Sequence, residues 1–167
     1  HIPHEIVPII AYPFGIKNLQ MFSLLNYFMQ GSSIVMGEVF THNIQFIICF
    51  FLTGLAMFYL VYFFTKDRYA SIFCGTAFTL SPYHFARSWD HLGLANMQWI
   101  VFYVYAFFKL HQTQKKRYAL LCGVMFGLVG QFSNYYYVYF VGLFSAAYLL
   151  FGGWYALFMR KSISRKE

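Results

Sequence analysis

Charged residues are scarce in this sequence. Only 10% of its 167 residues are charged, against about 25% in a typical soluble domain. Hydrophobic residues make up 60% of the chain and aromatic residues 24%. A soluble core of this size does not need so many aromatic side chains, whereas lipid-facing helices and the belts at a membrane surface do. The composition therefore predicts an integral membrane protein.

The familiar motifs of soluble nucleotide and hydrolytic enzymes are also missing. The sequence contains no Gly-rich phosphate loop, no Walker lysine, no HExxH and no GxSxG, which argues against soluble nucleotide chemistry. The net charge of +7 does not indicate nucleic acid as a partner. The basic residues occur in short clusters between apolar runs, and this pattern is typical of chains oriented in a membrane.

The sequence has three cysteines, and their positions indicate neither disulfide bonds nor a metal site. Cys49, Cys74 and Cys122 all lie inside apolar runs. An odd number of cysteines in such places argues against a disulfide framework or a zinc site. We interpret the three as small buried side chains, and we predict no metal site while leaving a divalent metal ion open as a cofactor.

The first part of the chain is predicted to be irregular. Residues 1–18 hold three of the four prolines, which prevents a regular helix, so we expect an extracytoplasmic loop with a turn at residues 12–15. His1, His4 and Glu5 could in principle ligate a metal, but we interpret them as part of a solvated loop.

An amphipathic helix is expected next. In residues 19–30, polar side chains recur every three to four positions among Leu, Met and Phe, which indicates a helix lying at the membrane surface. Residues 31–33, Gly-Ser-Ser, are predicted to end it. Residues 1–42 together form the predicted extracytoplasmic part.

Residues 43–167 are predicted to form a transmembrane helical domain. About 20 apolar residues cross a bilayer, and residues 118–159 carry no charge over twice that length, so this stretch must fold back at residues 131–134. The sequence thus predicts an all-α, polytopic protein with about five spans, at residues 43–65, 69–83, 94–110, 118–132 and 135–159.

Lysine and arginine orient these spans. If residue 1 lies outside and residue 167 in the cytoplasm, ten of the twelve basic residues fall on the inner side, as the positive-inside rule requires. Lys17 and Arg87 are the two exceptions. We therefore expect a plasma or inner membrane location.

A polar island, Ser81 to Trp99, interrupts the apolar runs. If it is helical, His84, Arg87 and His91 share one face through their spacing of three and four. A guanidinium fork and two imidazoles suit a phosphate or pyrophosphate. Asp90 could pair with Arg87, ligate a divalent ion or act as a base.

A plainer interpretation of the island stays open. Arg87 would extend to lipid headgroups with Asp90 as its partner. The neighbouring aromatic residues fit an interfacial belt, although stacking on a sugar ring is a second use for them. These residues are Trp89, Trp99, Tyr135, Tyr136, Tyr137 and Tyr139.

The order of motifs resembles a known superfamily. A Pro-rich loop with YPFG precedes TGLAMFYLVYFF and a basic turn, then SPYHFARSWDHLGLANMQWI, a second basic turn and FSNYYYVYF. This order is similar to that of polytopic bacterial membrane proteins of the GT-C glycosyltransferase superfamily, including the YfhO and Rgt-type groups. The resemblance covers nearly the whole chain.

The resemblance implies an activity. Such enzymes take a sugar from a polyprenyl-phosphate donor at the outer membrane face and pass it to a glycan, lipid or protein acceptor. It implies a substrate site in and beside the island, with Arg87 and His91 on the phosphate. The candidate substrate-binding residues are Tyr83, His84, Arg87, His91, Gln98 and Trp99.

The catalytic base is not located by this resemblance. The carboxylate of such enzymes follows their first transmembrane helix, and no acidic motif of that kind occurs here. Asp90 is the remaining candidate. Because the chain opens on His1, we expect a fragment that lacks its upstream and downstream parts and is inactive alone.

Two alternatives from other classes remain. A transporter or flippase for a lipid-linked or anionic substrate would carry ionisable residues at mid-membrane depth and broken helices there. The predicted spans place no such residue at mid-depth, which disfavours this class. A non-catalytic membrane scaffold would use the island only to bind a partner.

Overall fold

The computed structural model describes residues 6–7, 16–17, 24–133 and 135–163, and of these it gives the backbone alone for 6–7, 16–17, 24–26, 30, 90 and 153–163. Helices make up nearly all of this part, which confirms the all-α class. The helices are α1 (Leu24–Met36), α2 (Glu38–Thr65), α3 (Arg68–Thr79), α4 (Pro82–Asp90), α5 (Leu92–Ala95), α6 (Gln98–Thr113), α7 (Lys116–Phe132) and α8 (Tyr135–Ile163). Two antiparallel two-residue strands, β1 (Ile6–Val7) and β2 (Ile16–Lys17), precede them.

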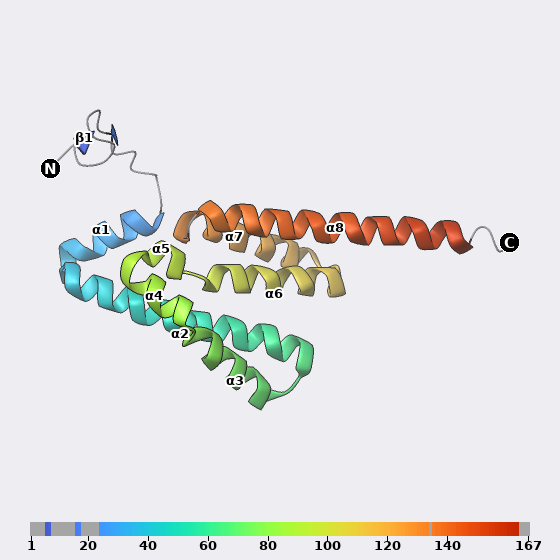
Figure 1. Ribbon diagram of the computed structural model, residues 1–167, viewed down its shortest axis with the longest axis horizontal. Coiled ribbons are helices and arrows are strands. Elements are labelled where there is room, and N and C mark those ends of the chain that lie inside the picture. The colour runs from blue at the N-terminus through green and yellow to red at the C-terminus, as the bar shows by residue number, and fades with distance from the viewer. Residues whose placement is uncertain (1–5, 8–15, 18–23, 134, 164–167) are drawn as a thin grey trace.

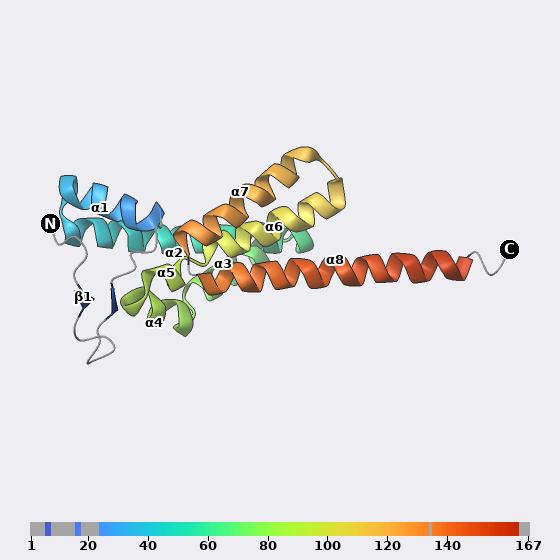
Figure 2. The same ribbon diagram turned by 90° about the horizontal axis from the view of Figure 1, so that it is seen from above.

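The longer helices run back and forth between two ends of the molecule (Figures 1 and 2). Helix α2 packs against α1, α3 and α6, and α7 packs against α6 and α8. The main apolar core lies where α6, α7 and α8 meet. Its buried members are Met97, Tyr103, Ala106, Phe107, Cys122, Val129, Tyr137 and Val141.

The turns at one end carry the basic residues, as predicted. Lys66 follows α2 with φ 59°, and Gln114 follows α6 with φ 54°, so each helix ends in the left-handed conformation. Asp67 then caps α3, because its carboxylate accepts hydrogen bonds from the backbone N–H groups of Tyr69 at 2.8 Å and Ala70 at 3.3 Å. Chain reversal at both basic turns is therefore confirmed.

Two lysines share one aromatic ring at this end. The Lys109 Nζ atom of α6 lies 4.9 Å from the centroid of the Phe63 ring of α2, and the Lys66 Nζ atom lies 5.2 Å from the same centroid. Each ammonium group is attracted by the negative face of the ring. The contact joins the last turns of α2 and α6.

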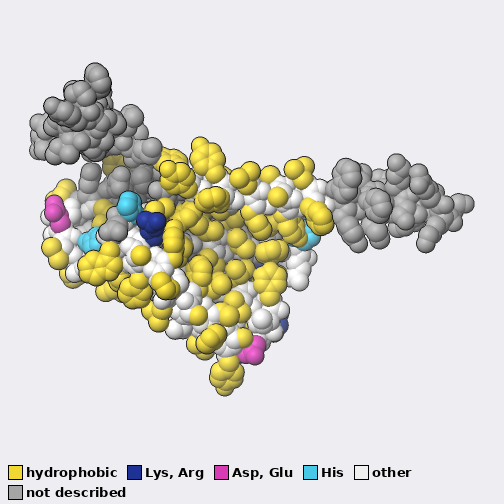
Figure 3. Space-filling view, viewed as in Figure 1, with side chains coloured by type: hydrophobic (Ala, Val, Ile, Leu, Met, Phe, Trp, Pro, Cys, Tyr) yellow, Lys and Arg dark blue, Asp and Glu magenta, His cyan; other side chains and the backbone are white. Residues whose placement is uncertain are grey.

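Within the residues that the structure describes, two helices are long and apolar enough, by length and composition, to cross a membrane: α2, and α8 over Tyr135–Gly152. Little of either apolar window is covered by the rest of the molecule, 17% in α2 and 6% in α8. Hydrophobic side chains accordingly cover much of the surface in view (Figure 3). The other three predicted spans are shorter. Helices α3, α6 and α7 have 12, 16 and 17 residues, which gives lengths of about 18 to 26 Å at 1.5 Å per residue.

The predicted spans at 69–83 and 94–110 are each broken by a bend. Helix α3 stops at Thr79, and α4 starts at Pro82 with the Ser81 hydroxyl as its cap, because proline has no N–H for a continuing helix. Helix α6 starts only at Gln98, after the separate turn α5. The predicted reversal at residues 131–134 is confirmed, since α7 ends at Phe132 and α8 begins at Tyr135.

The predicted end of the amphipathic helix at residues 31–33 is wrong. Helix α1 continues through this Gly-Ser-Ser stretch to Met36. The Ser32 hydroxyl donates to the Phe28 carbonyl at 2.6 Å, so the serine is accommodated inside the helix. The break comes at Gly37, with φ 82°, a conformation that glycine adopts at little cost. The predicted turn at residues 12–15 lies outside the described residues.

Two glycines allow the backbones of α2 and α3 to touch. A Cβ atom on Gly75 would lie 2.9 Å from the Gly54 carbonyl oxygen, and one on Gly54 would lie 2.8 Å from the Thr79 Oγ1 atom. The neighbour of Gly75 is backbone and cannot rotate away. Glycine at position 75 is therefore required for this helix pair.

Replacing Gly75 tests this contact. Gly75→Ala is expected to destabilise the protein by about 1–3 kcal/mol because the added methyl group overpacks the interface. The matched control is Gly123→Ala in α7, where a Cβ atom meets nothing within 4 Å and helix propensity predicts a gain of about 0.5–1 kcal/mol. Thermal unfolding in detergent measures both. Equal effects of the two variants would contradict the proposed contact.

Candidate functional site

The polar island folds into two short helices, α4 and α5. The Ser81 hydroxyl accepts a hydrogen bond from the His84 N–H at 3.4 Å, and proline at the first helical position suits the start of α4. His91 ends this helix with an extended backbone, φ −144°. One face of α4 is directed inward and the other is exposed. On the exposed face, the Trp89 side chain is 80% exposed.

His84 is the centre of the inward face. Its side chain is fully buried. The Nδ1 atom lies 2.8 Å from the Thr79 carbonyl oxygen, and the Nε2 atom lies 3.1 Å from the Ala95 carbonyl oxygen. Thr79 is the last residue of α3 and Ala95 the last of α5. One imidazole thus lies between two helix C-termini, whose last carbonyl groups have no partner within their own helices.

Cys49 brings α2 to the same place. Its Sγ atom lies 3.5 Å from His84 Nε2 and 3.2 Å from the Ala95 carbonyl oxygen. Cys49 is 11 residues from the first residue of α2 and 16 from the last, close to the middle of that helix. The buried His84 therefore contacts α2 well inside that helix and not at its end.

A chain of polar contacts extends from this junction to α7. The Thr53 hydroxyl donates to Gln98 Oε1 at 3.3 Å, and Gln98 Nε2 donates to Asn96 Oδ1 at 3.0 Å. Asn96 Nδ2 then donates to the Phe132 carbonyl at 2.9 Å, and the Ser133 hydroxyl donates to the Asn96 carbonyl. Buried polar groups need such partners, and here they fix the start of α6 against the end of α7.

The outward part of the site combines Arg87 with tyrosine. The Arg87 guanidinium lies over the Tyr83 ring, with 5.6 Å between Cζ and the ring centroid. The Tyr83 hydroxyl lies 3.1 Å from the Tyr137 hydroxyl of α8, which donates to the Leu94 carbonyl at 2.7 Å. Tyr83 is 47% exposed and Arg87 half-buried. On the face in view, a basic side chain lies close to histidine side chains (Figure 3).

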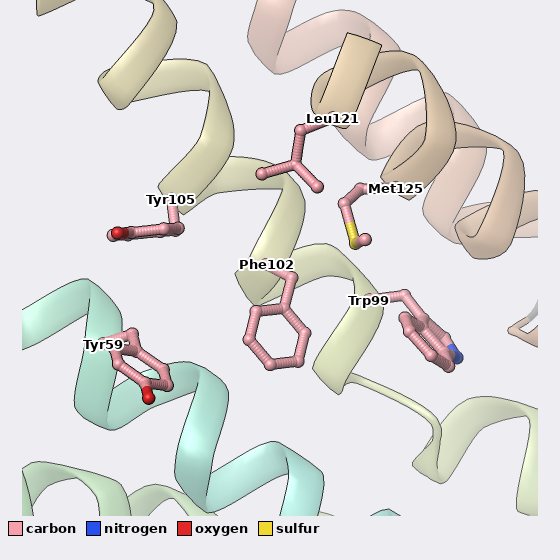
Figure 4. A pocket seen from close by; sticks show the side chains of 6 residues that line it. All are labelled: Tyr59, Trp99, Phe102, Tyr105, Leu121 and Met125. Carbon is pink, nitrogen blue, oxygen red and sulfur yellow. The ribbon is translucent and has the colours of Figure 1, made fainter. Parts of the chain in front are cut away.

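A separate apolar groove lies between α2, α6 and α7. Its volume is about 350 Å³, and its lining is Tyr59, Trp99, Phe102, Tyr105, Leu121 and Met125. Figure 4 shows these side chains around the space, with the indole nitrogen of Trp99 turned away from it. That nitrogen is buried without a hydrogen-bond partner.

The structure separates the six predicted substrate-binding residues into three places. Tyr83, Arg87 and His91 lie on or near the surface of the α4 segment, with His91 exposed. His84 and Gln98 are buried, 0% and 1% exposed, so the predicted common face of His84, Arg87 and His91 does not form. Trp99 lines the apolar groove.

Asp90, the candidate base, is placed at the end of α4, and its side chain lies outside what the structure describes. Within the described residues, no group of three or more His, Cys, Asp or Glu side chains could hold a metal ion. His1, His4 and Glu5 lie outside those residues. The geometry therefore adds no support for a divalent cofactor.

Cys49, Thr53 and Asn96 belong to the site but were not predicted from the sequence, and Tyr137 was named there only as one of a group of aromatic residues. Cys49 and Thr53 sit in an apolar run that gives no sign of polar contacts. Asn96 is two residues before Gln98, at the start of a predicted helix. This pair of amides is the feature of the sequence that could have indicated a polar contact there. Tyr137 is one of several neighbouring tyrosines, and only the fold distinguishes it.

Comparison of the chain with protein families, with curated proteins and with solved structures found no match.

The buried amide of Gln98 provides a test of the network. Gln98→Leu keeps a similar volume but leaves Thr53 and Asn96 without their partner, so we expect a loss of about 1–3 kcal/mol in stability. Gln112→Leu is the matched control on the same helix, because Gln112 is exposed. Thermal unfolding in detergent compares them. A destabilisation no larger than that of the control would show that the network contributes little.

Proposed function

We propose that the chain is part of a membrane glycosyltransferase that transfers a sugar from a polyprenyl-phosphate donor to an extracytoplasmic glycan or lipid acceptor. The observation that carries this proposal is the half-buried Arg87 on the Tyr83 ring, with exposed His91 following on the same segment. A guanidinium suits the paired oxygens of a phosphate, and stacking restrains it. The motif order that resembles GT-C enzymes supplies the reaction class.

The distribution of charge supports a membrane setting for this site. Lys66, Arg68 and Lys116 lie at the turns of one end, whereas Arg87 lies near the breaks at the other (Figure 1). With α2 and α8 as spans and α3, α6 and α7 as shorter partners, we propose five membrane-embedded helices. The basic end then faces the cytoplasm, and Arg87 faces outward.

In the proposed reaction, the acceptor hydroxyl attacks the anomeric carbon while the bond from that carbon to the phosphate oxygen breaks. Arg87 and His91 offset the charge that develops on the departing lipid phosphate. A carboxylate has to take the acceptor proton. Asp90 is the candidate within this chain.

A transporter of a lipid-linked or anionic substrate is the second candidate. The specific observation in its favour is the buried His84 between the broken ends of α3 and α5, because interrupted helices with ionisable groups at their ends are typical of transporter sites. Assays of sugar transfer and of substrate movement across sealed vesicles distinguish a transferase from a transporter.

Cysteine labelling tests the orientation. Trp89→Cys, at an exposed position, is expected to react with a membrane-impermeant thiol reagent in intact cells. Lys116→Cys, at the basic end, is expected to react only after the membrane is permeabilised. The unmodified chain reports any labelling of its three native cysteines. The reverse pattern would exclude the proposed topology.

Arg87→Ala in the full-length protein tests the transferase. We expect a loss of transfer of roughly 10²–10³-fold, the range seen when one transition-state donor is removed, with unchanged expression. Transfer of labelled sugar from a panel of polyprenyl-phosphate hexoses is the assay, and Arg117→Ala, an exposed arginine at the opposite end, is the control. Unchanged transfer in Arg87→Ala would refute the assigned role. Substrate movement across sealed vesicles without sugar transfer would favour the transporter.

A further inference from the structure

The basic end of the molecule, where α2 and α6 finish, carries an excess of positive charge. Residues 65–69 and 109–117 form its turns and hold a single acidic residue, Asp67. The Asp67 carboxylate accepts two backbone N–H groups at the start of α3. The same two segments hold six basic residues: Lys66, Arg68, Lys109, Lys115, Lys116 and Arg117. This end therefore suits an anionic ligand.

Two of these lysines fold back toward the apolar helices. The Lys109 Nζ atom lies 5.9 Å from the ring centroid of Tyr105, one turn earlier in α6, and 4.9 Å from that of Phe63. The Lys66 Nζ atom lies 5.8 Å from the ring centroid of Tyr62 and 5.2 Å from that of Phe63. A lysine that only extends to water directs its ammonium group away from apolar surface. These two ammonium groups instead lie where α2 and α6 meet.

The apolar groove between α2, α6 and α7 begins beside these two lysines. Tyr59 and Tyr105 line one end of the groove, and Trp99 lines the other (Figure 4). The Tyr105 ring meets the Phe63 ring edge to face, with 5.9 Å between centroids, so the groove ends where the lysines lie. All six lining side chains are at least partly exposed. The groove is therefore open to the surroundings of the helices.

The separation between the lysines and the far end of the groove fits one acyl chain. Lys109 follows Trp99 by ten residues in α6, which is about 15 Å along the helix axis. Each leaflet supplies half of a hydrocarbon core of about 30 Å, so a chain that starts at Lys109 reaches Trp99 near its end. A soluble anion would meet the lysines and leave the groove empty, whereas a phospholipid occupies both.

We propose that this part of the molecule binds one anionic phospholipid of the bilayer, with its phosphate at Lys66 and Lys109 and one acyl chain in the groove that ends at Trp99. Basic pockets between membrane helices recognise anionic headgroups in this way, and each lysine contributes about a five-fold factor in affinity. The apolar lining takes the chain out of contact with water. This inference rests on the proposed membrane setting and is independent of the proposed sugar transfer.

Trp99 serves as a reporter of the groove. Trp89→Phe and Trp154→Phe together leave it as the single tryptophan of the chain. This chain is placed in phosphatidylcholine nanodiscs that contain increasing fractions of a lipid with brominated acyl chains, because bromine quenches tryptophan fluorescence on contact. We expect brominated phosphatidylglycerol to reach half-maximal quenching at a fraction roughly 5- to 30-fold lower than brominated phosphatidylcholine, the factor for one to two lysines. Equal quenching by the two lipids would overturn the proposal.

Two pairs of lysine variants locate the headgroup. Lys66→Gln with Lys109→Gln is expected to abolish the preference for phosphatidylglycerol, and Lys109→Gln alone to lower it about five-fold. Lys115→Gln with Lys116→Gln is the matched control, because it removes the same charge from exposed positions at the same end, and it should keep most of the preference. An equal loss in both pairs would show that the charge acts without a defined site and would refute the proposal.

A groove variant locates the acyl chain. Met125→Phe places a larger side chain in the lining and is expected to reduce the quenching of Trp99 by phosphatidylglycerol to the level of phosphatidylcholine. Val124→Phe, at an exposed position next to it on α7, is the control and should leave the quenching unchanged. Thermal unfolding in lipid-free detergent verifies that both variants fold. Undiminished quenching in Met125→Phe would place the chain outside the groove and contradict the proposed site.

Discussion

Two helices end inside this molecule, and a single imidazole lies against the last carbonyl group of each. Helix α3 stops at Thr79 because Pro82 follows, and α5 is only one turn long. In an apolar environment an unpaired carbonyl group costs several kcal/mol, so such breaks persist only where another group supplies the donor. The His84 imidazole lies within hydrogen-bond distance of both carbonyl oxygens, and the Ala95 carbonyl also accepts the Met97 N–H at 2.6 Å.

The same contact decides which side chains of the island are accessible. With His84 directed inward, the flank of α4 that carries Tyr83 and Arg87 lies toward the surface, and the pair of Tyr83 and Tyr137 hydroxyl groups ties this flank to α8. One nine-residue helix thus carries both the buried His84 and the partly exposed pair of Tyr83 and Arg87. The groove beside Trp99 lies apart from both and is apolar throughout.

Much of the helical framework could be predicted from the sequence, because the signals for it are local. Runs without charge, the basic turns at Lys66 and Lys115, and the break at residues 131–134 set the order of the helices. The burial of His84 could not be predicted. Its polar surroundings in the sequence indicated an accessible loop, whereas the side chain is fully buried against Cys49 near the middle of α2. Cysteine in an apolar run carries no sign of such a partner, and only tertiary packing brings the two together. Likewise, Gly37 rather than the earlier Gly-Ser-Ser ends α1, because a serine can bond back to its own helix.

The two lysines on Phe63 have a consequence for how α2 and α6 lie side by side. Both helices start at the same end of the molecule and end at the other (Figure 1), and their aromatic residues meet in parallel register, Tyr59 and Phe63 with Tyr105 and Phe64 with Phe108. Parallel neighbours place the negative poles of their macrodipoles next to each other, which is unfavourable. Lys66 and Lys109 bring two ammonium groups to that pole. The two lysines at this end therefore offset the repulsion between two aligned helices.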